Sequence, residues 1–189
     1  MKYFQLEGAI DETLLTKFMD FCNNNTSEEW TIVINSGGGK STLATMILSI
    51  INSNLDKTTL ISAGCYSAAF YIFFFSKCKR KIIYGSLGMH HREYLKGMYI
   101  NEKGKPKYQD DICQIQNLKS VRDNFLSKLM TKKEKSIYNN DDDVYFTFKR
   151  MKELFPKLEI VQWRILVSNA TFRPLKKFKI AHGNRLQSY

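Results

Sequence analysis

A strand, a glycine-rich loop, a helix and a second strand follow one another between residues 31 and 62. Thr31–Ile34 (TIVI) is a run of β-branched residues typical of a strand buried on both faces. The loop NSGGGKS leads into a helix predicted over Thr42–Asn54, and the next strand is predicted over Thr59–Ser62. Two strands joined through a helix form a right-handed βαβ unit in nearly all known cases. The pattern therefore predicts an α/β fold with a parallel sheet.

Periodicity and capping residues predict the remaining elements. In the helix over Thr42–Asn54, the side expected to face the sheet carries Leu43, Met46, Ile47, Ile50 and Ile51. The other predicted elements are a strand over Tyr3–Leu6, a turn over Gly8–Asp11, a helix over Glu12–Asn23 capped by Asp11, a strand over Lys81–Tyr84, an extended segment over Leu87–His91, a long helix over Asp111–Met130, a helix opened by a capping box at Thr131–Glu134, a helix capped by Thr147, and a strand over Leu158–Val167.

Length and charge bound the class of protein. A chain of 189 residues with 43% hydrophobic residues is long enough to fold as one globular domain, expected over residues 1–160. The net charge of +11 is concentrated near the end, where Tyr145–Tyr189 alone carries +8, and residues 161–189 are expected to form a basic extension. No RNA-binding, zinc-finger or homeodomain pattern accompanies this charge, so nucleic-acid binding is not expected.

The cysteines and the first residues indicate the compartment. Cys22, Cys65, Cys78 and Cys113 are far apart and form no CxxC or CxxH pair, which argues against a zinc site and a disulfide framework. The opening residues MKYFQLEGAIDE carry acidic residues where a signal peptide would need an apolar core. We therefore expect a cytoplasmic protein that uses no metal or cofactor.

Thr58–Ser76 is an uncharged stretch flanked by basic residues, and by length alone it could just span a bilayer. Its first half is rich in Thr, Ser, Gly and Cys. We instead predict a strand, a tight turn at Gly64 and a buried helix, and no membrane association.

The glycine loop admits two interpretations. Gly39-Lys40-Ser41 matches the end of a phosphate-binding P-loop, but that motif also needs a glycine five places before Gly39, where this chain has Ile34. The remaining interpretation is that bare backbone N–H groups at the carboxyl end of a strand approach a ligand or a developing oxyanion.

Ser67 and His91 are candidates for nucleophile and base. Ser67 lies in an uncharged segment, and the imidazole of His91 follows 24 residues later. Small residues in an apolar run also serve close packing, so Ser67 alone does not decide between the two roles. The acids Asp141, Asp142 and Asp143 resemble a calcium cluster in composition but lack the alternating ligands and glycine of an EF-hand loop.

Taken in order, these motifs resemble the proteolytic subunit of the Clp protease and the wider ClpP/crotonase fold, over about four-fifths of the chain. Ile34–Gly39 (INSGGG) is similar to the family's INSPGG loop, with Gly37 in place of proline. Gly64–Phe70 (GCYSAAF) resembles the family's serine motif, one residue shorter before the serine. Ser86–His91 (SLGMHH) is similar to SRVMIH, Lys79-Arg80 to GKR, and Asp143–Thr147 (DVYFT) to the family's D-R-F-L/M-S/T.

The resemblance implies repeated β-β-α units around a parallel sheet, with a long protruding helix. It implies a serine endopeptidase that cleaves unfolded polypeptides inside a self-assembled ring. Ser67 would be the nucleophile, His91 the base and Asp143 the third triad member, while Asp141 and Asp142 are the alternative acids. The backbone N–H groups of Gly39 and Ala68 would form the oxyanion hole.

The chain also departs from the family pattern. We expect no counterpart of the N-terminal axial segment that gates the Clp ring and helps dock its ATPase, and the family's residues after the histidine are replaced by Arg92-Glu93. An AAA+ unfoldase is therefore a candidate partner, although the segment that usually helps to dock it is not expected in this chain. Two alternatives stay open: a non-catalytic or regulatory ClpP-like subunit, and a crotonase-like acyl-CoA enzyme.

Overall fold

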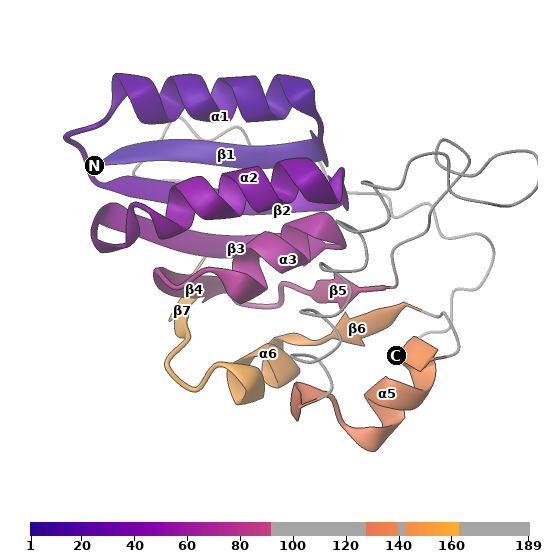
Figure 1. Ribbon diagram of the computed structural model, residues 1–189. Coiled ribbons are helices and arrows are strands. Elements are labelled where there is room, and N and C mark those ends of the chain that lie inside the picture. The colour runs from indigo at the N-terminus through magenta and orange to yellow at the C-terminus, as the bar shows by residue number, and fades with distance from the viewer. Residues whose placement is uncertain (92–127, 140–142, 163–189) are drawn as a thin grey trace, which may run out of the picture.

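The computed structural model describes residues 1–91, 128–139 and 143–162 (Figure 1). Its strands and helices are β1 (Lys2–Ile10), α1 (Glu12–Asn24), β2 (Trp30–Gly39), α2 (Ser41–Asn52), a short 3₁₀ helix (Leu55–Lys57), β3 (Thr58–Tyr66), α3 (Ala68–Phe75), β4 (Lys79–Ile83), β5 (Gly88–His90), α5 (Lys132–Asn139), β6 (Val144–Phe146), α6 (Phe148–Leu154) and β7 (Glu159–Val161).

The predicted parallel sheet is confirmed. In the described part of the chain the strand order is β1-β2-β3-β4-β7, and every neighbouring pair along this path is parallel. β5 pairs in parallel with the last residues of β3, and β6 pairs antiparallel with β5. The sheet is therefore extended at the carboxyl end of β3, where the serine motif lies.

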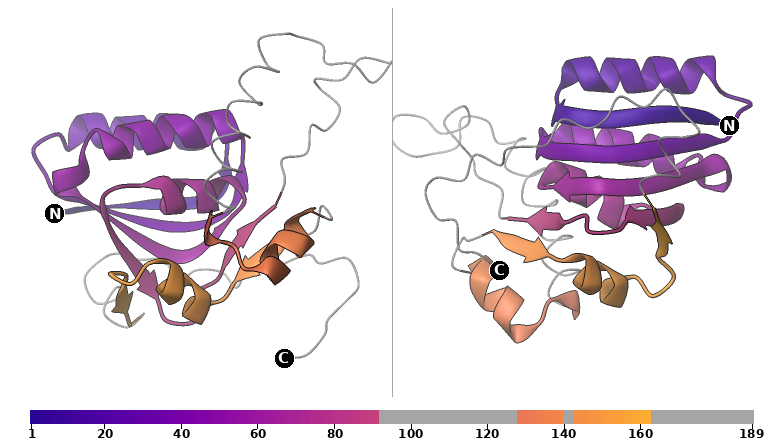
Figure 2. Two further views of the ribbon diagram at one scale, coloured as in Figure 1. Left: turned by 60° about the horizontal axis from the view of Figure 1, so that its bottom comes forward. Right: turned by 180° about the vertical axis from the view of Figure 1, so that it is seen from behind.

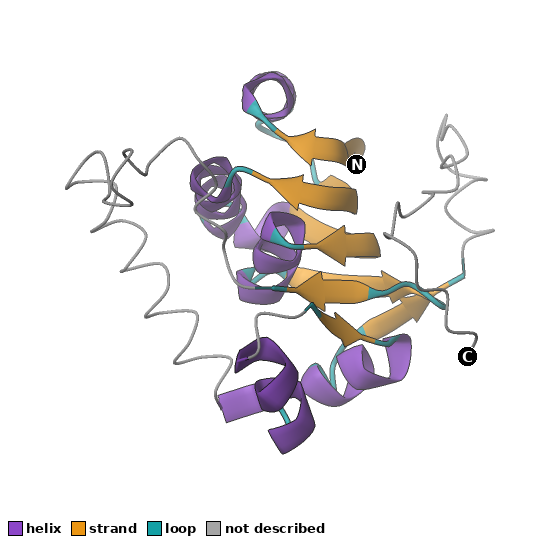
Figure 3. Cartoon of the chain, turned by 90° about the vertical axis from the view of Figure 1, so that its right-hand side faces the viewer, coloured by secondary structure: helices purple, strands orange, loops and turns teal. Residues whose placement is uncertain are grey.

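One face of the sheet carries the main core, because the helices gather on that side (Figure 3). Strand residues such as Ile32, Ile34 and Leu60 are fully buried there against helix residues such as Ile47 and Phe73. At the end of the sheet, α5 and α6 lie beside β6 (Figure 2). These contacts hold the short strands β5 and β6 in place.

Two strands run further than the sequence predicts. β1 continues past Gly8, whose φ of +82° accompanies a register shift in its pairing with β2. β3 continues through Gly64, which pairs with Asn35 of β2, so the predicted turn at Gly64 is wrong and the chain turns at Ser67 instead. Ladder pairing with β2 keeps Gly64 extended, although the glycine by itself favours a turn.

The inner face of α2 is rotated from the predicted one. Ile47 and Ile51 are buried as expected, together with Ala44 and Leu48, whereas Met46 is 48% exposed. The buried residues Ala44, Ile47, Leu48 and Ile51 follow i, i+3, i+4 and i+7 spacing and lie on one face of the helix. Met46 lies on the opposite face.

The predicted caps are confirmed. Leu14 N donates to Asp11 Oδ1 over 2.8 Å at the start of α1, and Arg150 N donates to Thr147 Oγ1 over 3.3 Å at the start of α6. The capping box before α5 closes in both directions, with Thr131 N to Glu134 Oε2 at 2.6 Å and Glu134 N to Thr131 Oγ1 at 3.2 Å.

The uncharged stretch Thr58–Ser76 is divided between β3 and α3. Within the described residues, no helix is long and apolar enough to cross a membrane. Most of the long helix predicted over Asp111–Met130 lies outside the described residues, as does the chain from residue 163 onward. Of the strand predicted over Leu158–Val167, the described part contains β7.

Candidate active site

Ser67 occupies a sharp turn between β3 and α3. Its φ of +54° and ψ of −122° make it the one non-glycine residue with positive φ in the described part of the chain. Ser67 N donates to Met89 O of β5 over 2.8 Å, and Ser67 O accepts from Tyr71 N in the first turn of α3. An L-residue in this region is strained, and such strain is concentrated at functional sites.

Gly38 makes room for this turn. A Cβ added to Gly38 would lie 2.7 Å from Ser67 Cβ and 2.8 Å from Tyr66 O, closer than real side chains approach. The φ of Gly38 is +97°, which also favours glycine. The glycine loop therefore contacts the serine turn through Gly38. The sequence alone does not show which of the three consecutive glycines makes this contact.

His91 lies beside the serine hydroxyl. Its Nε2 is 2.8 Å from Ser67 Oγ, within hydrogen-bond range. β5 brings the two together because Cys65 and Tyr66 of β3 pair with Gly88 and Met89 of β5. A serine and an imidazole in direct contact are the pair that nucleophilic catalysis requires.

His90 points the other way, into the core. It is 5% exposed, and its ring lies 5.9 Å from the Phe70 ring and 5.5 Å from the Tyr138 ring, measured between centroids. Successive residues of a strand face opposite sides, so burial of one histidine leaves the other on the serine side.

Asp143 immediately precedes β6, the strand that pairs with β5. The antiparallel register joins Gly88 with Phe146 and His90 with Val144, and His91 and Asp143 are the next residues along the chain just beyond this ladder. The Asp143 carboxylate accepts a hydrogen bond from Tyr145 Oη at 3.4 Å, and among the described residues it makes no hydrogen bond to His91. The other two candidate acids, at positions 141 and 142, lie outside the described residues.

Tyr145 stays protonated beside this acid. Burial, followed by the negative charge of Asp143, raises the pKa of the Tyr145 phenol. A protonated phenol can donate a hydrogen bond to the carboxylate. Sequence reasoning missed Tyr145, and its position two residues after Asp143 was the available signal.

Of the two predicted oxyanion donors, Ala68 lies at the serine turn, whereas Gly39 lies at the end of β2, paired with Ile10 of β1. Ala68 is the first residue of α3, so its N–H has no acceptor within the helix and shares the positive end of the helix dipole. Gly38 N is already bonded to Ser36 Oγ at 3.1 Å, and Gly39 follows it, beside Ile10 of β1. The structure thus brings Gly38 into contact with the serine turn and places Gly39 next along the loop.

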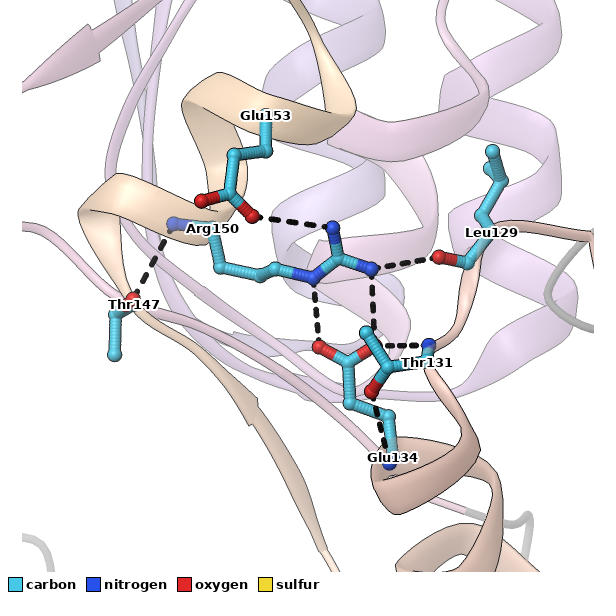
Figure 4. Close-up of polar contacts among 6 residues, drawn as sticks. All are labelled: Leu129, Thr131, Glu134, Thr147, Arg150 and Glu153. Atoms are coloured by element: carbon cyan, nitrogen blue, oxygen red, sulfur yellow. Dashed lines mark hydrogen bonds and ion pairs between the residues drawn. The ribbon is translucent and has the colours of Figure 1, made fainter.

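A polar cluster around Arg150 holds the helices next to β6 (Figure 4). The Arg150 guanidinium donates to both Glu134 carboxylate oxygens, from Nε at 2.7 Å and from the terminal nitrogen at 3.0 Å, and also to Leu129 O at 2.6 Å. Burial would raise the pKa of Glu134, but the bonds from Arg150 and Thr131 outweigh it and hold that pKa below its usual value. The capping box is visible in the sequence, whereas its arginine partner sixteen residues later is not.

The three described cysteines, Cys22, Cys65 and Cys78, are buried thiols. Burial raises the pKa of Cys65 to about 12, despite a 3.3 Å hydrogen bond from Ser62 Oγ. Cys65 lies two residues before Ser67, but a thiol that stays protonated is a poor nucleophile. Its position favours packing over catalysis. Cys113 lies outside the described residues.

No protein-family model and no curated protein matches this sequence. Among solved structures, a ClpP1 mutant from Listeria monocytogenes superposes with a TM-score of 0.59, covering 86% of this chain and 92% of that one at 17% identity. The fold is ClpP-like. At this level of identity the similarity extends to the architecture, and the roles of individual residues rest on the geometry described above.

Proposed function

We propose that this chain is a serine endopeptidase that cleaves unfolded polypeptides. The observation that carries the proposal is the 2.8 Å contact between His91 Nε2 and Ser67 Oγ, on a serine held in a strained turn at the N-terminus of a helix. ClpP-like architecture supports the same reaction class.

Ser67 Oγ attacks the carbonyl carbon of the peptide bond while His91 Nε2 takes the hydroxyl proton. The peptide C–N bond then breaks, and the imidazolium returns that proton to the leaving amine. Water hydrolyses the acyl-serine by the same proton transfers in reverse order, which releases the acid and regenerates Ser67. No cofactor or metal is assigned a step in this mechanism.

The oxyanion that forms in each half-reaction would be bound by Ala68 N–H and Gly39 N–H. Each such donor contributes roughly 3–4 kcal/mol to the transition state. For Ala68 the support is its place at the first position of α3, and for Gly39 it is its place directly after the glycine that contacts Ser67.

Asp143 is the proposed third member of the triad, supported by its position next to the end of the β5–β6 ladder, where His91 also lies. Its carboxylate would accept from the other imidazole nitrogen and stabilise the charged form of the ring. Catalytic hydrogen bonds are often long in ligand-free structures and tighten in the substrate complex, which fits an acid one step beyond the paired residues.

Three wider features are proposed with the activity: assembly into a homo-oligomeric ring, a cytoplasmic location, and an AAA+ unfoldase as candidate partner. A ring would confine cleavage to polypeptide that can enter it. These features rest on the resemblance to the Clp proteolytic subunit.

Hydrolysis of a fluorogenic peptide and of casein by wild type and Ser67→Ala tests the proposal. We expect Ser67→Ala to lower kcat at least ~10³-fold, because loss of a triad nucleophile removes the covalent pathway. Ser49→Ala is the matched control, since Ser49 is exposed on α2 and alanine favours helices. Wild-type protein should also react with a fluorophosphonate at Ser67.

Equal cleavage by wild type and Ser67→Ala contradicts the proposal. Folded wild-type protein that neither cleaves peptides nor reacts with the fluorophosphonate indicates the non-catalytic subunit instead. Tight binding of an acyl-CoA thioester by such protein indicates the crotonase-like alternative.

A further inference from the structure

A basic pocket lies away from the serine, where the turn between α3 and β4 meets the chain between α6 and β7. Its volume is about 610 Å³. Four of its lining residues, Lys77, Lys79, Arg80 and Lys157, are basic, and none is Asp or Glu. The other lining residues are Cys78, Leu154, Phe155, Pro156 and Leu158. We call this the β4–α6 pocket.

Arg80 carries a positive charge without a carboxylate partner in the described part of the chain. One terminal nitrogen of its guanidinium donates to Phe74 O over 3.0 Å, and the group lies 4.1 Å from the centre of the Phe155 ring. Burial lowers the pKa of Arg80, which shows that the charge is partly withdrawn from water. A guanidinium has five N–H groups, so donors remain for a ligand after the bond to Phe74.

Two lysines add to this charge and a third is partly compensated. Lys79 Nζ forms an ion pair with Glu159 at 2.9 Å, and because the same carboxylate also pairs with Lys81 at 2.9 Å, the charge of Lys79 is only partly compensated. Lys77 and Lys157 are exposed and make no ion pair with a described residue. Three uncompensated cations therefore surround a floor formed by Cys78, Phe155 and Leu158.

We propose that the β4–α6 pocket binds a phosphate group. Arginine presents paired N–H donors that match phosphate oxygens, and lysine is a common second ligand. Three cations attract a doubly charged phosphate more strongly than they attract a singly charged carboxylate, because each cation adds a Coulomb attraction that grows with the charge of the ligand. The phosphate is either free, as in a small molecule, or carried on a polypeptide.

This site is separate from the proposed catalytic one. Arg80 contacts α3 at Phe74, near its C-terminus, and Ser67 caps the other end of the same eight-residue helix. The two ends are about 12 Å apart along the helix axis. Phosphate binding therefore does not depend on peptidase activity, and its failure would leave the proposed function untouched.

Calorimetric titration with inorganic diphosphate at constant ionic strength tests the site. The pocket variant is Lys77→Glu with Lys157→Glu, both at exposed positions that the fold does not need. The control reverses two exposed lysines elsewhere, Lys17→Glu with Lys133→Glu, so that the net charge changes equally. We expect the pocket variant to weaken binding at least tenfold and the control to change it less than threefold.

A phosphoserine peptide and its unphosphorylated counterpart form the second arm. Tighter binding of the phosphopeptide than of diphosphate, lost in the pocket variant, supports the site and assigns the phosphate to a polypeptide; the reverse order supports a small molecule. Equal weakening in the pocket and control variants overturns the proposal, because general attraction to a basic chain then explains the binding. Failure of both probes to bind wild type overturns it as well.

Discussion

At the scale of the residue, Ser67 combines backbone strain with an unusual neighbour. A non-glycine residue at φ +54° costs about 1–3 kcal/mol, and the surrounding structure must supply that energy. Ser67 N and O are both held, by Met89 O and Tyr71 N, and Gly38 leaves the space that the turn needs. The strain is retained at a side chain that contacts His91.

Replacing Ser67 by glycine should therefore stabilise the fold while removing activity. We expect Ser67→Gly to raise the free energy of unfolding by about 1 kcal/mol relative to Ser67→Ala, because glycine adopts positive φ without steric cost. Urea unfolding at pH 7 measures the difference. A Ser67→Gly protein less stable than Ser67→Ala would mean that the turn is relaxed.

The identity of the triad acid is also a question of single residues. We expect Asp143→Asn to reduce kcat about 10⁴-fold, the size of effect seen when a triad aspartate is replaced by its amide. Asp141→Asn and Asp142→Asn are the matched controls and should stay within tenfold of wild type. A large loss at either control, with activity kept in Asp143→Asn, would transfer the role to the other acid.

At the scale of the element, the pair formed by Arg150 and Glu134 joins α6 to the start of α5. The side chains are 20% and 13% exposed, so the pair is shielded from water and salt more than a surface ion pair. Between these helices and the serine turn lie β6 and β5, whose ladder ends one residue before His91 and one residue after Asp143. Loss of this pair would loosen the support of the short strands.

Glu134→Gln should destabilise the protein in a pH-dependent way. The pKa of Glu134 is held below its usual 4.5 in the folded state, so its stabilising effect is complete above about pH 4.5 and is lost as the pH falls through the folded pKa. We expect a loss of about 2 kcal/mol at pH 7, the size typical of hydrogen bonds to charged groups, and a smaller loss near pH 3.5.

Urea unfolding of wild type and variant at both pH values measures this. Glu153→Gln is the control, because Glu153 bonds the same arginine but is 51% exposed, and it should cost less than 1 kcal/mol at pH 7. An effect of Glu134→Gln that is the same at both pH values would show that the charge of Glu134 is not what stabilises the contact.

At the scale of the whole molecule, assembly is the main prediction. If the chain forms a ring, sedimentation should give a mass several times that of one 189-residue chain, and peptidase activity should fall on dilution as the ring dissociates. The measurement is analytical ultracentrifugation alongside peptide hydrolysis over a range of protein concentrations. A monomer with undiminished activity would remove the ring from the proposal and leave the catalytic residues in place.

Much of the fold could be predicted from the sequence because its signals are short in range. Asp11, Thr131 and Thr147 cap helices through bonds to residues three positions away, and the alternation of strands and helices predicts a parallel sheet. Even here, pairing with a neighbouring strand overrode the local preference, as at Gly64.

The sequence by itself determined the order of the elements, the glycine loop, the candidate serine and the caps, since each depends on residues a few positions apart. Three contacts depend on how distant segments pack: the glycine that contacts the serine turn, the histidine that faces the hydroxyl, and the binding of Arg150 to Glu134. These contacts join residues 16 to 29 positions apart, and they are set by the register of β3, β5 and β6 and by the packing of α5 and α6 beside β6. A register one residue different would have turned His91 toward the core and His90 toward the serine.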